Sequence, residues 1–338
     1  MVKQVKAFGP QDLRVVTSDA PDLKTDEVLI EMKACGICGS DKWFWHVEEP
    51  NDYVAGHEVA GKVLAVGEDV HSLKAGDRVA VNNVKGCGRC NACRAGEFVR
   101  CEKPLTHMGF GFSQKLAVPA RNCLPLHPDI SYEAGSLIFD NWGTPHSALK
   151  RTSIKEGDLV AVTGCGPIGL AAIALAKLRG AKVLAIDPVE ARLKMAEHLG
   201  AYAVVTPSNA REQVKDLTSG KGLGYVIECS GSPKSYEFAF SSLAIGGTLV
   251  SIGEGAEVKV RFSDLIHKHL TIEASLYSTM KDGAEIQELI VNREINPMAF
   301  LTHRFELEEL PGSFGKVFDL NDGVLKAIVL NGSQERIT

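Results

Sequence analysis

Long hydrophobic runs are missing from this sequence of 338 residues, in which no stretch of about 18 or more apolar residues occurs. A transmembrane helix needs about 20 such residues, so we expect no membrane-spanning segment and no membrane partner. The opening residues, MVKQVKAFGP, also lack the apolar centre of a secretory signal peptide. We therefore expect a cytoplasmic protein.

A strong charge of either sign is missing too. The net charge is −5 and the isoelectric point is near 6.1, so no strongly basic surface is expected and nucleic acid is excluded as a partner. Hydrophobic residues make up 45% and charged residues 23%, which is typical of a soluble globular enzyme. The length exceeds that of one typical hydrophobic core and predicts two domains.

Cysteine, by contrast, is plentiful, with nine residues of which six fall in two tight clusters. In a reducing compartment, clustered thiols bind metal more often than they form disulfides. The nine are Cys35, Cys38, Cys87, Cys90, Cys93, Cys101, Cys123, Cys165 and Cys229.

The pattern of expected strands and helices changes along the chain. Residues 1–150 contain short Val-rich runs that end in Gly, Asp or Asn, which predicts a β-rich domain with a compact, partly open barrel. Residues 151–282 alternate strand-like and helical segments, which predicts an α/β domain with a doubly wound parallel sheet. The alternation fades near residue 280, and 283–338 are expected to return to the first domain.

A glycine motif opens the α/β domain. Gly164-Cys165-Gly166-Pro167-Ile168-Gly169 follows the expected strand DLVAVT and begins the expected helix IGLAAIALAKLRG. In this context Gly164 permits a tight turn, Gly166 lets the backbone approach a pyrophosphate, and Gly169 lets helix and strand pack closely. The helix N-terminus, including Pro167 and Ile168, would then face the phosphates of a dinucleotide.

Asp187 follows the next expected strand, about 20 residues after the glycines, where an acid accepts hydrogen bonds from the adenosine ribose. A carboxylate there repels the 2′-phosphate of NADP, so we favour NAD. Arg192 lies close enough in sequence to contact a phosphate, which leaves NADP open as an alternative.

The cysteines of CGRCNACRAGEFVRC predict a closed metal site. Four thiolates between residues 87 and 101 can surround one Zn²⁺ tetrahedrally and leave no open position, which makes the site structural. The alternatives are disulfides, which conflict with a reducing compartment, and an iron–sulfur cluster. The ligands would be Cys87, Cys90, Cys93 and Cys101, within a lobe at about 86–103.

A second group lies upstream and suits a catalytic zinc, which takes about three mixed protein ligands and an open position. Cys38 and His57 are the main candidates, and Glu58 could orient the site or bind the metal itself. Cys35, Ser40 and Asp41 belong to the same stretch. The alternative for His57 is a buried histidine with satisfied hydrogen bonds.

With these motifs, GICGSD, GHEVAG, the four-cysteine stretch and GCGPIGL, the chain resembles the zinc-containing medium-chain dehydrogenases, sorbitol and threonine dehydrogenases among them. The resemblance covers essentially the whole chain. It implies a GroES-like β-rich catalytic domain, a Rossmann domain and a cleft between them. It also implies two zinc ions per chain, one catalytic and one structural, and a homodimer or homotetramer.

Carried over residue by residue, the resemblance makes Cys38 and His57 zinc ligands and Cys35 a bystander. It gives Ser40 the proton of the substrate hydroxyl and makes Asp41 a partner of the zinc ligands. It also places three further residues beside the nicotinamide. These are Cys229, Ser230 and Gly231.

The third catalytic ligand is assigned to Asp140, because threonine dehydrogenases likewise have an Asp after Ile-Phe in the stretch SLIFDNWGTPH. The alternatives are that Asp140 caps the following helix and that Glu58 is the ligand. Trp43 stands where many relatives have a proton-relaying histidine, so His46 or direct transfer from Ser40 must serve instead. Trp43, Phe44 and Trp45 are interpreted as substrate-pocket wall, subunit contact or simple packing.

The sequence thus predicts a zinc-dependent, NAD-linked alcohol dehydrogenase that oxidises a secondary alcohol, such as a polyol, sugar alcohol, cyclitol or amino alcohol, to a ketone. One alternative is a zinc-free NAD(P)H reductase of the same superfamily. The other is a non-catalytic NAD-binding sensor. For the oligomer, the strand GTLVSIGEG and the apolar run near SLYSTM are expected at a subunit boundary.

Overall fold

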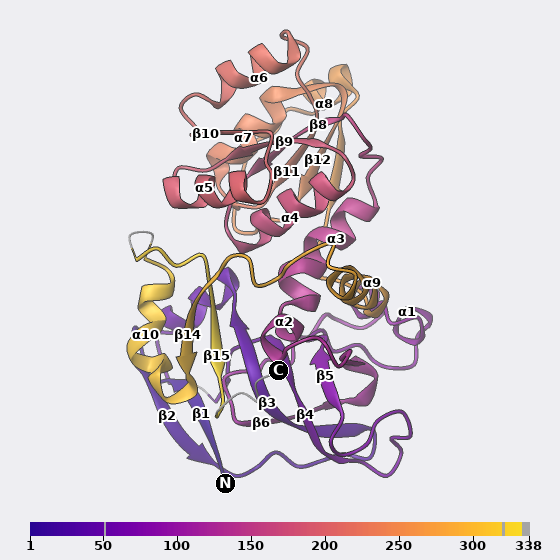
Figure 1. Ribbon diagram of the computed structural model, residues 1–338, viewed down its shortest axis with the longest axis vertical. Coiled ribbons are helices and arrows are strands. Elements are labelled where there is room, and N and C mark those ends of the chain that lie inside the picture. The colour runs from indigo at the N-terminus through magenta and orange to yellow at the C-terminus, as the bar shows by residue number, and fades with distance from the viewer. Residues whose placement is uncertain (51, 320–321, 333–338) are drawn as a thin grey trace. The chain divides into compact units, whose positions relative to one another are not determined.

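The computed structural model describes residues 1–50, 52–319 and 322–332. It divides into two compact units, each of which is treated by itself (Figure 1). Unit 1 comprises Met1–Gly143 together with the chain from Ser278 onward, and unit 2 comprises Thr144–Tyr277. The predicted domain limits at residues 150 and 282 remain predictions.

Unit 1 is built on a mostly antiparallel seven-stranded sheet with the order β14-β15-β3-β4-β5-β7, to which β6 adds by pairing with β3. A separate hairpin pairs β1 with β2. The strands are β1 (Val2–Ala7), β2 (Leu13–Ser18), β3 (Glu27–Ile37), β4 (Glu58–Val66), β5 (Arg78–Val81), β6 (Lys115–Pro119), β7 (Cys123–Pro125), β14 (Leu301–Glu306) and β15 (Lys326–Leu330).

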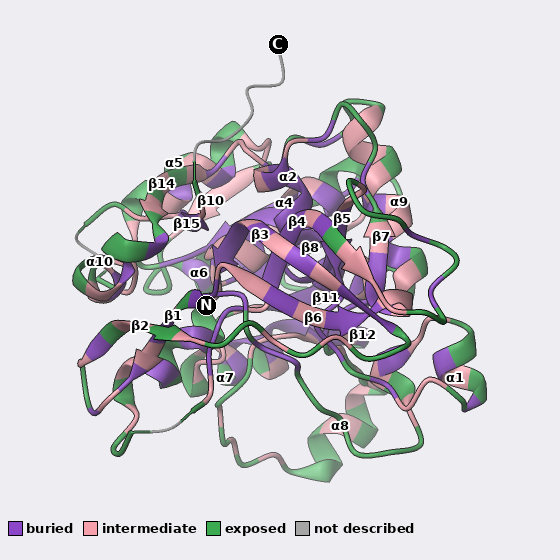
Figure 2. Cartoon of the chain, turned by 90° about the horizontal axis from the view of Figure 1, so that it is seen from below, coloured by how far each residue is buried: buried purple, intermediate pink, exposed green. Residues whose placement is uncertain are grey.

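Short helical segments connect these strands. They are η1 (Gly39–His46), α1 (Asn91–Arg94), η2 (Phe98–Arg100), η3 (Ala120–Asn122), α2 (Tyr132–Ser136), η4 (Ile138–Trp142), α9 (Met280–Val291), η5 (Leu307–Glu309) and α10 (Leu310–Val317). The core of the unit lies between the sheet and these segments, and it includes most of β3 and the first half of β4 (Figure 2). Their Val, Ile and Ala content explains both the strand conformation and the burial.

Unit 2 is a six-stranded parallel sheet with the order β10-β9-β8-β11-β12-β13. In chain order this reads 3-2-1-4-5-6, the arrangement of dinucleotide-binding doubly wound folds, and it confirms the predicted fold class. The strands are β8 (Leu159–Thr163), β9 (Lys182–Ile186), β10 (Ala203–Val205), β11 (Leu223–Glu228), β12 (Leu243–Ser251) and β13 (Thr271–Ala274).

Helix α3 precedes the sheet of unit 2, and the other helices alternate with its strands as the sequence pattern predicts. They are α3 (Gly143–Lys150), α4 (Pro167–Leu178), α5 (Glu190–His198), α6 (Ala210–Thr218), α7 (Pro233–Ser242) and α8 (Phe262–Lys268). Helix α4 begins with Pro167 in its first turn, and Gly180 adopts a positive φ of 80° just beyond its end. Both positions match the usual preferences of helix termini.

One expectation about the sheet edge needs correction. The strand GTLVSIGEG, expected at a subunit boundary, is β12 and lies inside the sheet between β11 and β13. The edge strand is β13, whose sequence TIEA is too short and polar to stand out from the sequence alone. Among the described residues, no helix is both long enough and apolar enough to span a bilayer.

Candidate metal and dinucleotide sites

The upstream candidates meet because β3 and β4 run antiparallel. Their register pairs Gly36 with Glu58, so the end of β3 lies beside the start of β4. Cys38 follows β3 directly, and His57 immediately precedes β4. Sheet pairing therefore brings together residues that lie about 20 positions apart in the sequence.

Asp140 joins them from η4, a π-helical turn between α2 and α3. Such turns are rare and occur mostly at functional sites, where the wider turn redirects a side chain. The Asp140 carboxylate lies within this turn, 3.0 Å from His57 Nε2. One ligand atom from each of Cys38, His57, Glu58 and Asp140 lies within 4.8 Å of the others. As candidates for holding a metal, these four residues are called the metal-ligand group below.

Asp41 contacts two members of this group. Its Oδ2 accepts a hydrogen bond of 2.9 Å from the Cys38 backbone N–H, and its Oδ1 lies 3.3 Å from His57 Nδ1. A carboxylate on Nδ1 fixes the imidazole ring and leaves Nε2 directed at the shared space, as in many metal sites.

The electrostatics of the group favour a cation. Burial would lower the pKa of His57, but the negative groups Asp41, Cys38 and Asp140 outweigh it and raise this pKa well above its usual value. Burial and the nearby Asp140 raise the pKa of Cys38. Glu58 Oε2 is buried without a hydrogen-bond partner among the described residues. A sulfur, a nitrogen and carboxylate oxygens around one space fit zinc by their chemistry.

Ser40, Trp43 and His46 lie on the 3₁₀ helix η1, in which side chains three residues apart eclipse one another. The three therefore share one face, and Trp43 stands between the other two. At a rise of about 2.0 Å per residue, Ser40 and His46 are roughly 12 Å apart along the helix. Ser40 is exposed, while Trp43 is 48% exposed.

Two aromatic residues that no sequence motif indicates accompany Trp43. Its ring centroid lies 5.3 Å from that of Tyr53, which in turn lies 6.3 Å from that of Phe110. Phe110 adopts a φ of 68°, a strained conformation for a bulky residue, and is 41% exposed. Burial and the charge of Asp41 raise the pKa of Tyr53, which places this aromatic cluster near the metal-ligand group.

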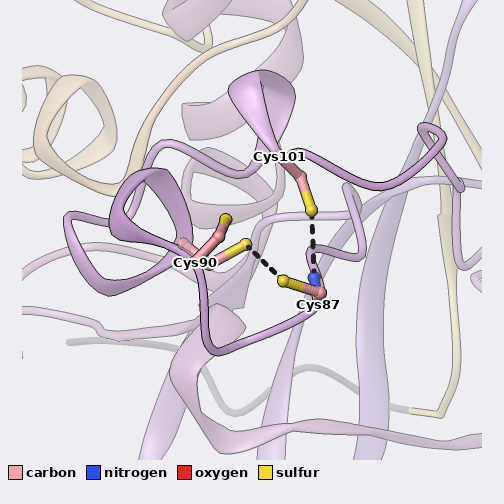
Figure 3. Close-up of side chains that lie close together, drawn as sticks. Cys87, Cys90 and Cys101 are labelled. Atoms are coloured by element: carbon pink, nitrogen blue, oxygen red, sulfur yellow. Dashed lines mark hydrogen bonds between the residues drawn. The ribbon is translucent and has the colours of Figure 1, made fainter.

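The four-cysteine lobe is also assembled in the structure. Cys87, Cys90, Cys93 and Cys101 each offer a sulfur within 4.8 Å of the others. Three of the four converge in Figure 3, where the Cys87 backbone N–H donates to Cys101 Sγ at 3.3 Å. Within residues 86–103, Phe98 is the only large apolar side chain that is buried. So small an apolar core is consistent with a lobe that gains stability from a bound metal.

Backbone amides make two of these thiols acidic. The N–H groups of Arg89 and Cys90 lower the pKa of Cys87 to about 6. The N–H groups of Glu102 and Cys93 lower that of Cys90. Burial raises the pKa of Cys93 to about 12. Oriented amides thus stabilise thiolates in the lobe, which is the protonation state that zinc requires.

The glycine motif lies where expected, between β8 and α4. Gly164 has a φ of 84°, and a Cβ there would lie 2.7 Å from Ser230 Cβ. A Cβ on Gly169 would lie 1.9 Å from the Gly164 carbonyl oxygen. A Cβ on Gly166 would meet nothing within 4 Å, so no packing inside the protein requires this glycine. The open space before Gly166 fits a phosphate group approaching the backbone.

Asp187 lies directly after β9 and is buried. Its Oδ2 accepts a hydrogen bond of 2.7 Å from the Cys165 N–H, and its Oδ1 accepts one of 2.8 Å from the Val189 N–H. Arg192 lies 3.6 Å from Oδ2. The acid is therefore fixed beside the glycine turn with a cation next to it.

The strand β11 pairs with β8, and it is followed directly by Cys229, Ser230 and Gly231. Glu228, which the sequence analysis did not single out, holds this turn from the strand end. Its carboxylate accepts hydrogen bonds from the backbone N–H groups of Ser230 and Gly231 at 2.8 and 3.1 Å. Buried completely, Glu228 keeps the turn packed on Gly164.

Comparison with known proteins agrees with this geometry. The family model "Alcohol dehydrogenase GroES-like domain" matches residues 24–128, and "Zinc-binding dehydrogenase" matches residues 167–292. Sorbitol dehydrogenase of Bacillus subtilis is 33% identical, with 97% of each chain covered. The chain belongs to the zinc-type medium-chain alcohol dehydrogenase family.

Other members of this zinc-type family are similar over most of their length. L-threonine 3-dehydrogenase of Shewanella putrefaciens is 30% identical, covering 91% of this chain and 94% of the relative. The solved alcohol dehydrogenase TADH of Thermus sp. ATN1 superposes with a TM-score of 0.89 at 29% identity, covering 98% of this chain and 100% of the other. Family membership makes the chain an oxidoreductase of the alcohol dehydrogenase type and confirms the resemblance seen in the sequence.

The acidity of Cys87 can be tested by alkylation. In protein stripped of zinc, we expect iodoacetamide to modify Cys87 before Cys93 at neutral pH, because a pKa of about 6 leaves Cys87 largely as thiolate. The Cys87 rate should fall as the pH is lowered through about 6, and zinc should protect the residue. Peptide mass spectrometry measures both, with buried Cys123 as the unreactive control. Equal labelling of Cys87 and Cys93 would contradict this assignment.

Asp187→Ser tests cofactor selection. Removing the carboxylate should weaken NAD and admit NADP, shifting the ratio of their dissociation constants by roughly ten- to hundredfold, or about 1.4–2.7 kcal/mol. Fluorescence titration of both dinucleotides measures this ratio. Because Arg192 is the neighbouring cation, Asp187→Ser combined with Arg192→Ala should lose the gain for NADP. An NADP affinity that does not improve in the single variant would refute the role of Asp187.

Proposed function

We propose that this chain catalyses the reversible, NAD-linked and zinc-dependent oxidation of a secondary alcohol to a ketone. The observation that carries this proposal is the group formed by Cys38, His57, Glu58 and Asp140, whose ligand atoms lie within 4.8 Å of one another. A mixed sulfur, nitrogen and oxygen set of this kind is typical of a catalytic zinc with an open position. The four-cysteine lobe supports a second, structural zinc.

In this proposal Cys38, His57 and Asp140 hold the metal, and Glu58 is the additional acidic ligand. A bound Zn²⁺ supplies Lewis-acid polarisation of the substrate oxygen, which lowers the pKa of the alcohol. Asp41 orients His57 through Nδ1 and steadies the Cys38 loop through the backbone N–H. These contacts keep the ligands in place while the substrate enters and leaves.

Ser40 receives the proton of the substrate hydroxyl. Its exposure at the start of η1 lets a hydroxyl pass the proton to solvent directly. Trp43 cannot accept a proton and separates Ser40 from His46 on the same face of η1, so His46 is not required. The rings of Trp43 and Phe110, which are exposed, and of Tyr53, which is partly buried, would line the approach of the substrate to the metal-ligand group and favour a substrate larger than ethanol.

The dinucleotide is proposed to bind at the glycine turn of unit 2. Gly166 and the first turn of α4, with Pro167 and Ile168, receive the pyrophosphate, and Asp187 accepts hydrogen bonds from the adenosine ribose. Residues 229–231 would flank the nicotinamide ring, and a bound dinucleotide would supply hydride-acceptor chemistry there. The fixed carboxylate of Asp187 favours NAD over NADP.

The substrate class is proposed from the relatives. Those named for sorbitol, L-arabinitol, L-galactonate and L-threonine act on molecules that carry a secondary hydroxyl beside further polar groups. We propose a polyol, sugar alcohol, cyclitol or amino alcohol on this basis. We further propose a homo-oligomer in which the edge strand β13 meets a second copy, since Ile272 of β13 and Leu276, two residues beyond it, are 48% and 44% exposed.

Metal analysis separates this proposal from its two alternatives. We expect about two zinc ions per purified chain, one at each site. Mild chelation should remove the catalytic ion and stop turnover of a polyol with NAD, while circular dichroism still reports a folded protein. A zinc-free reductase would keep its activity after chelation. A non-catalytic sensor would bind NAD and oxidise no alcohol in a screen of polyols, inositols and amino alcohols.

Cys38→Ala tests the separate roles of the two sites. Losing the thiolate ligand should lower turnover by about a thousandfold or more, since zinc contributes several kcal/mol to the stabilisation of charge in the transition state. NAD affinity, measured by fluorescence, should stay unchanged because the dinucleotide contacts lie in unit 2. The matched control is Cys35→Ala, which removes a buried thiol of β3, three residues before Cys38, and should keep turnover. Loss of NAD binding in Cys38→Ala would refute the separation.

A further inference from the structure

A buried lysine lies beside the metal-ligand group and has no role in the function proposed so far. Lys326 begins β15 and is only 1% exposed. Lysine is almost never fully buried unless it is paired, because removing its charge from water is costly. Its position in the protein interior therefore needs a specific explanation.

Sheet register carries Lys326 to the site. The neighbouring residue Ala327 pairs with Ile37 of β3, and Gly36 of β3 pairs with Glu58 of β4. The lysine Nζ donates hydrogen bonds to the Ile37 carbonyl at 2.9 Å and to Glu58 Oε1 at 2.6 Å. It thus reaches across β3 from one neighbouring strand to the other.

Gly36 makes room for this pair. A Cβ at this position would lie 2.0 Å from Glu58 Oε2 and 2.9 Å from its Cδ, so any side chain would displace the carboxylate. The glycine is therefore explained by the location of Glu58 and not by its own backbone conformation. The position of the Glu58 carboxylate on β4 therefore depends on Lys326 of β15 and on Gly36 of β3.

The two oxygens of Glu58 have different surroundings. Oε1 is held by Lys326, whereas Oε2 is buried and has no hydrogen-bond partner among the described residues. A buried carboxylate oxygen without a partner is costly and points to a missing ligand. Glu58 also belongs to the group whose ligand atoms lie within 4.8 Å, with Cys38, His57 and Asp140.

We propose that Lys326 is a positioning residue for the catalytic metal. The lysine holds Oε1 of Glu58, so that only Oε2 is available as a metal ligand. This inference rests on the proposed zinc function. With Oε1 held, Glu58 can approach the metal through one oxygen and withdraw from it without leaving its place. Without the lysine, the carboxylate is free to rotate and to offer both oxygens or neither.

The test is Lys326→Met, which keeps the length of the side chain and removes its charge. We expect the affinity of the catalytic site for metal to fall by about ten- to hundredfold, as is typical when a group that orients a ligand is lost. Cobalt substitution should show a changed visible absorption spectrum at this site, because the coordination of Glu58 changes. Lys33→Met is the control, since Lys33 pairs with Glu31 on the same sheet, at 3.1 Å and partly exposed.

A second variant covers the possibility that a lone buried Glu58 prevents folding. Lys326→Met with Glu58→Leu replaces the whole ion pair by apolar groups, which is often neutral for stability. A purely structural pair would leave this double variant with wild-type metal affinity and cobalt spectrum. Because Glu58 is itself a proposed ligand, the double variant should fold and release its catalytic metal faster, while the cysteine lobe keeps its metal. The change in Lys326→Met alone then measures how much of this loss depends on the lysine.

The outcomes distinguish the two proposals. Wild-type protein that carries two metals, combined with unchanged metal affinity and cobalt spectrum in either Lys326 variant, would overturn the role of Lys326 alone. Wild-type protein that carries metal only in the cysteine lobe would overturn the zinc function and this inference together.

Discussion

The antiparallel pairing of β3 with β4 is the constraint on which the metal-ligand group depends. One strand ends just before Cys38, and the other begins just after His57, so their register fixes the distance between the thiol and the imidazole. Side chains alternate between the faces of a sheet, and a slip of one residue would turn Glu58 away from the group. β3 also pairs with β15 and β6, so any such slip would disturb three strand pairs at once.

The same sheet explains which parts of the site could be predicted from the sequence. The glycine turn and the four cysteines each lie within a short stretch, so their spacing alone indicates the geometry. Cys38 and His57 were recognisable because two short motifs flank a strand pair. Lys326 was not, because its strand KAIVL looks like an ordinary apolar strand, and a lysine at a strand end is usually expected to be exposed. Only the register of three strands, which the sequence does not reveal, places this lysine next to Glu58.

Other misses have similar physical causes. Asp140 could be named but not placed, since whether it caps a helix or reaches a histidine depends on a π-helical turn with no clear sequence signal. The cluster of Trp43, Tyr53 and Phe110 combines three separate segments, and Phe110 adopts a positive φ that sequence reasoning would assign to glycine. In unit 2, β13 lies at the edge because of the strand order, and the sequence of a polar four-residue strand does not indicate that order.

The charges around the metal-ligand group explain why these residues act together. Asp41, Asp140, Glu58 and the thiol of Cys38 surround one histidine in a largely buried space, where several negative charges cannot coexist without compensation. Lys326 compensates Glu58, and a protonated His57 could compensate one more. A divalent cation compensates two charges and at the same time satisfies Glu58 Oε2, so it serves better than protons held by the same groups. The thiolate and the imidazole then favour zinc over the hard cations magnesium and calcium, which prefer oxygen ligands alone.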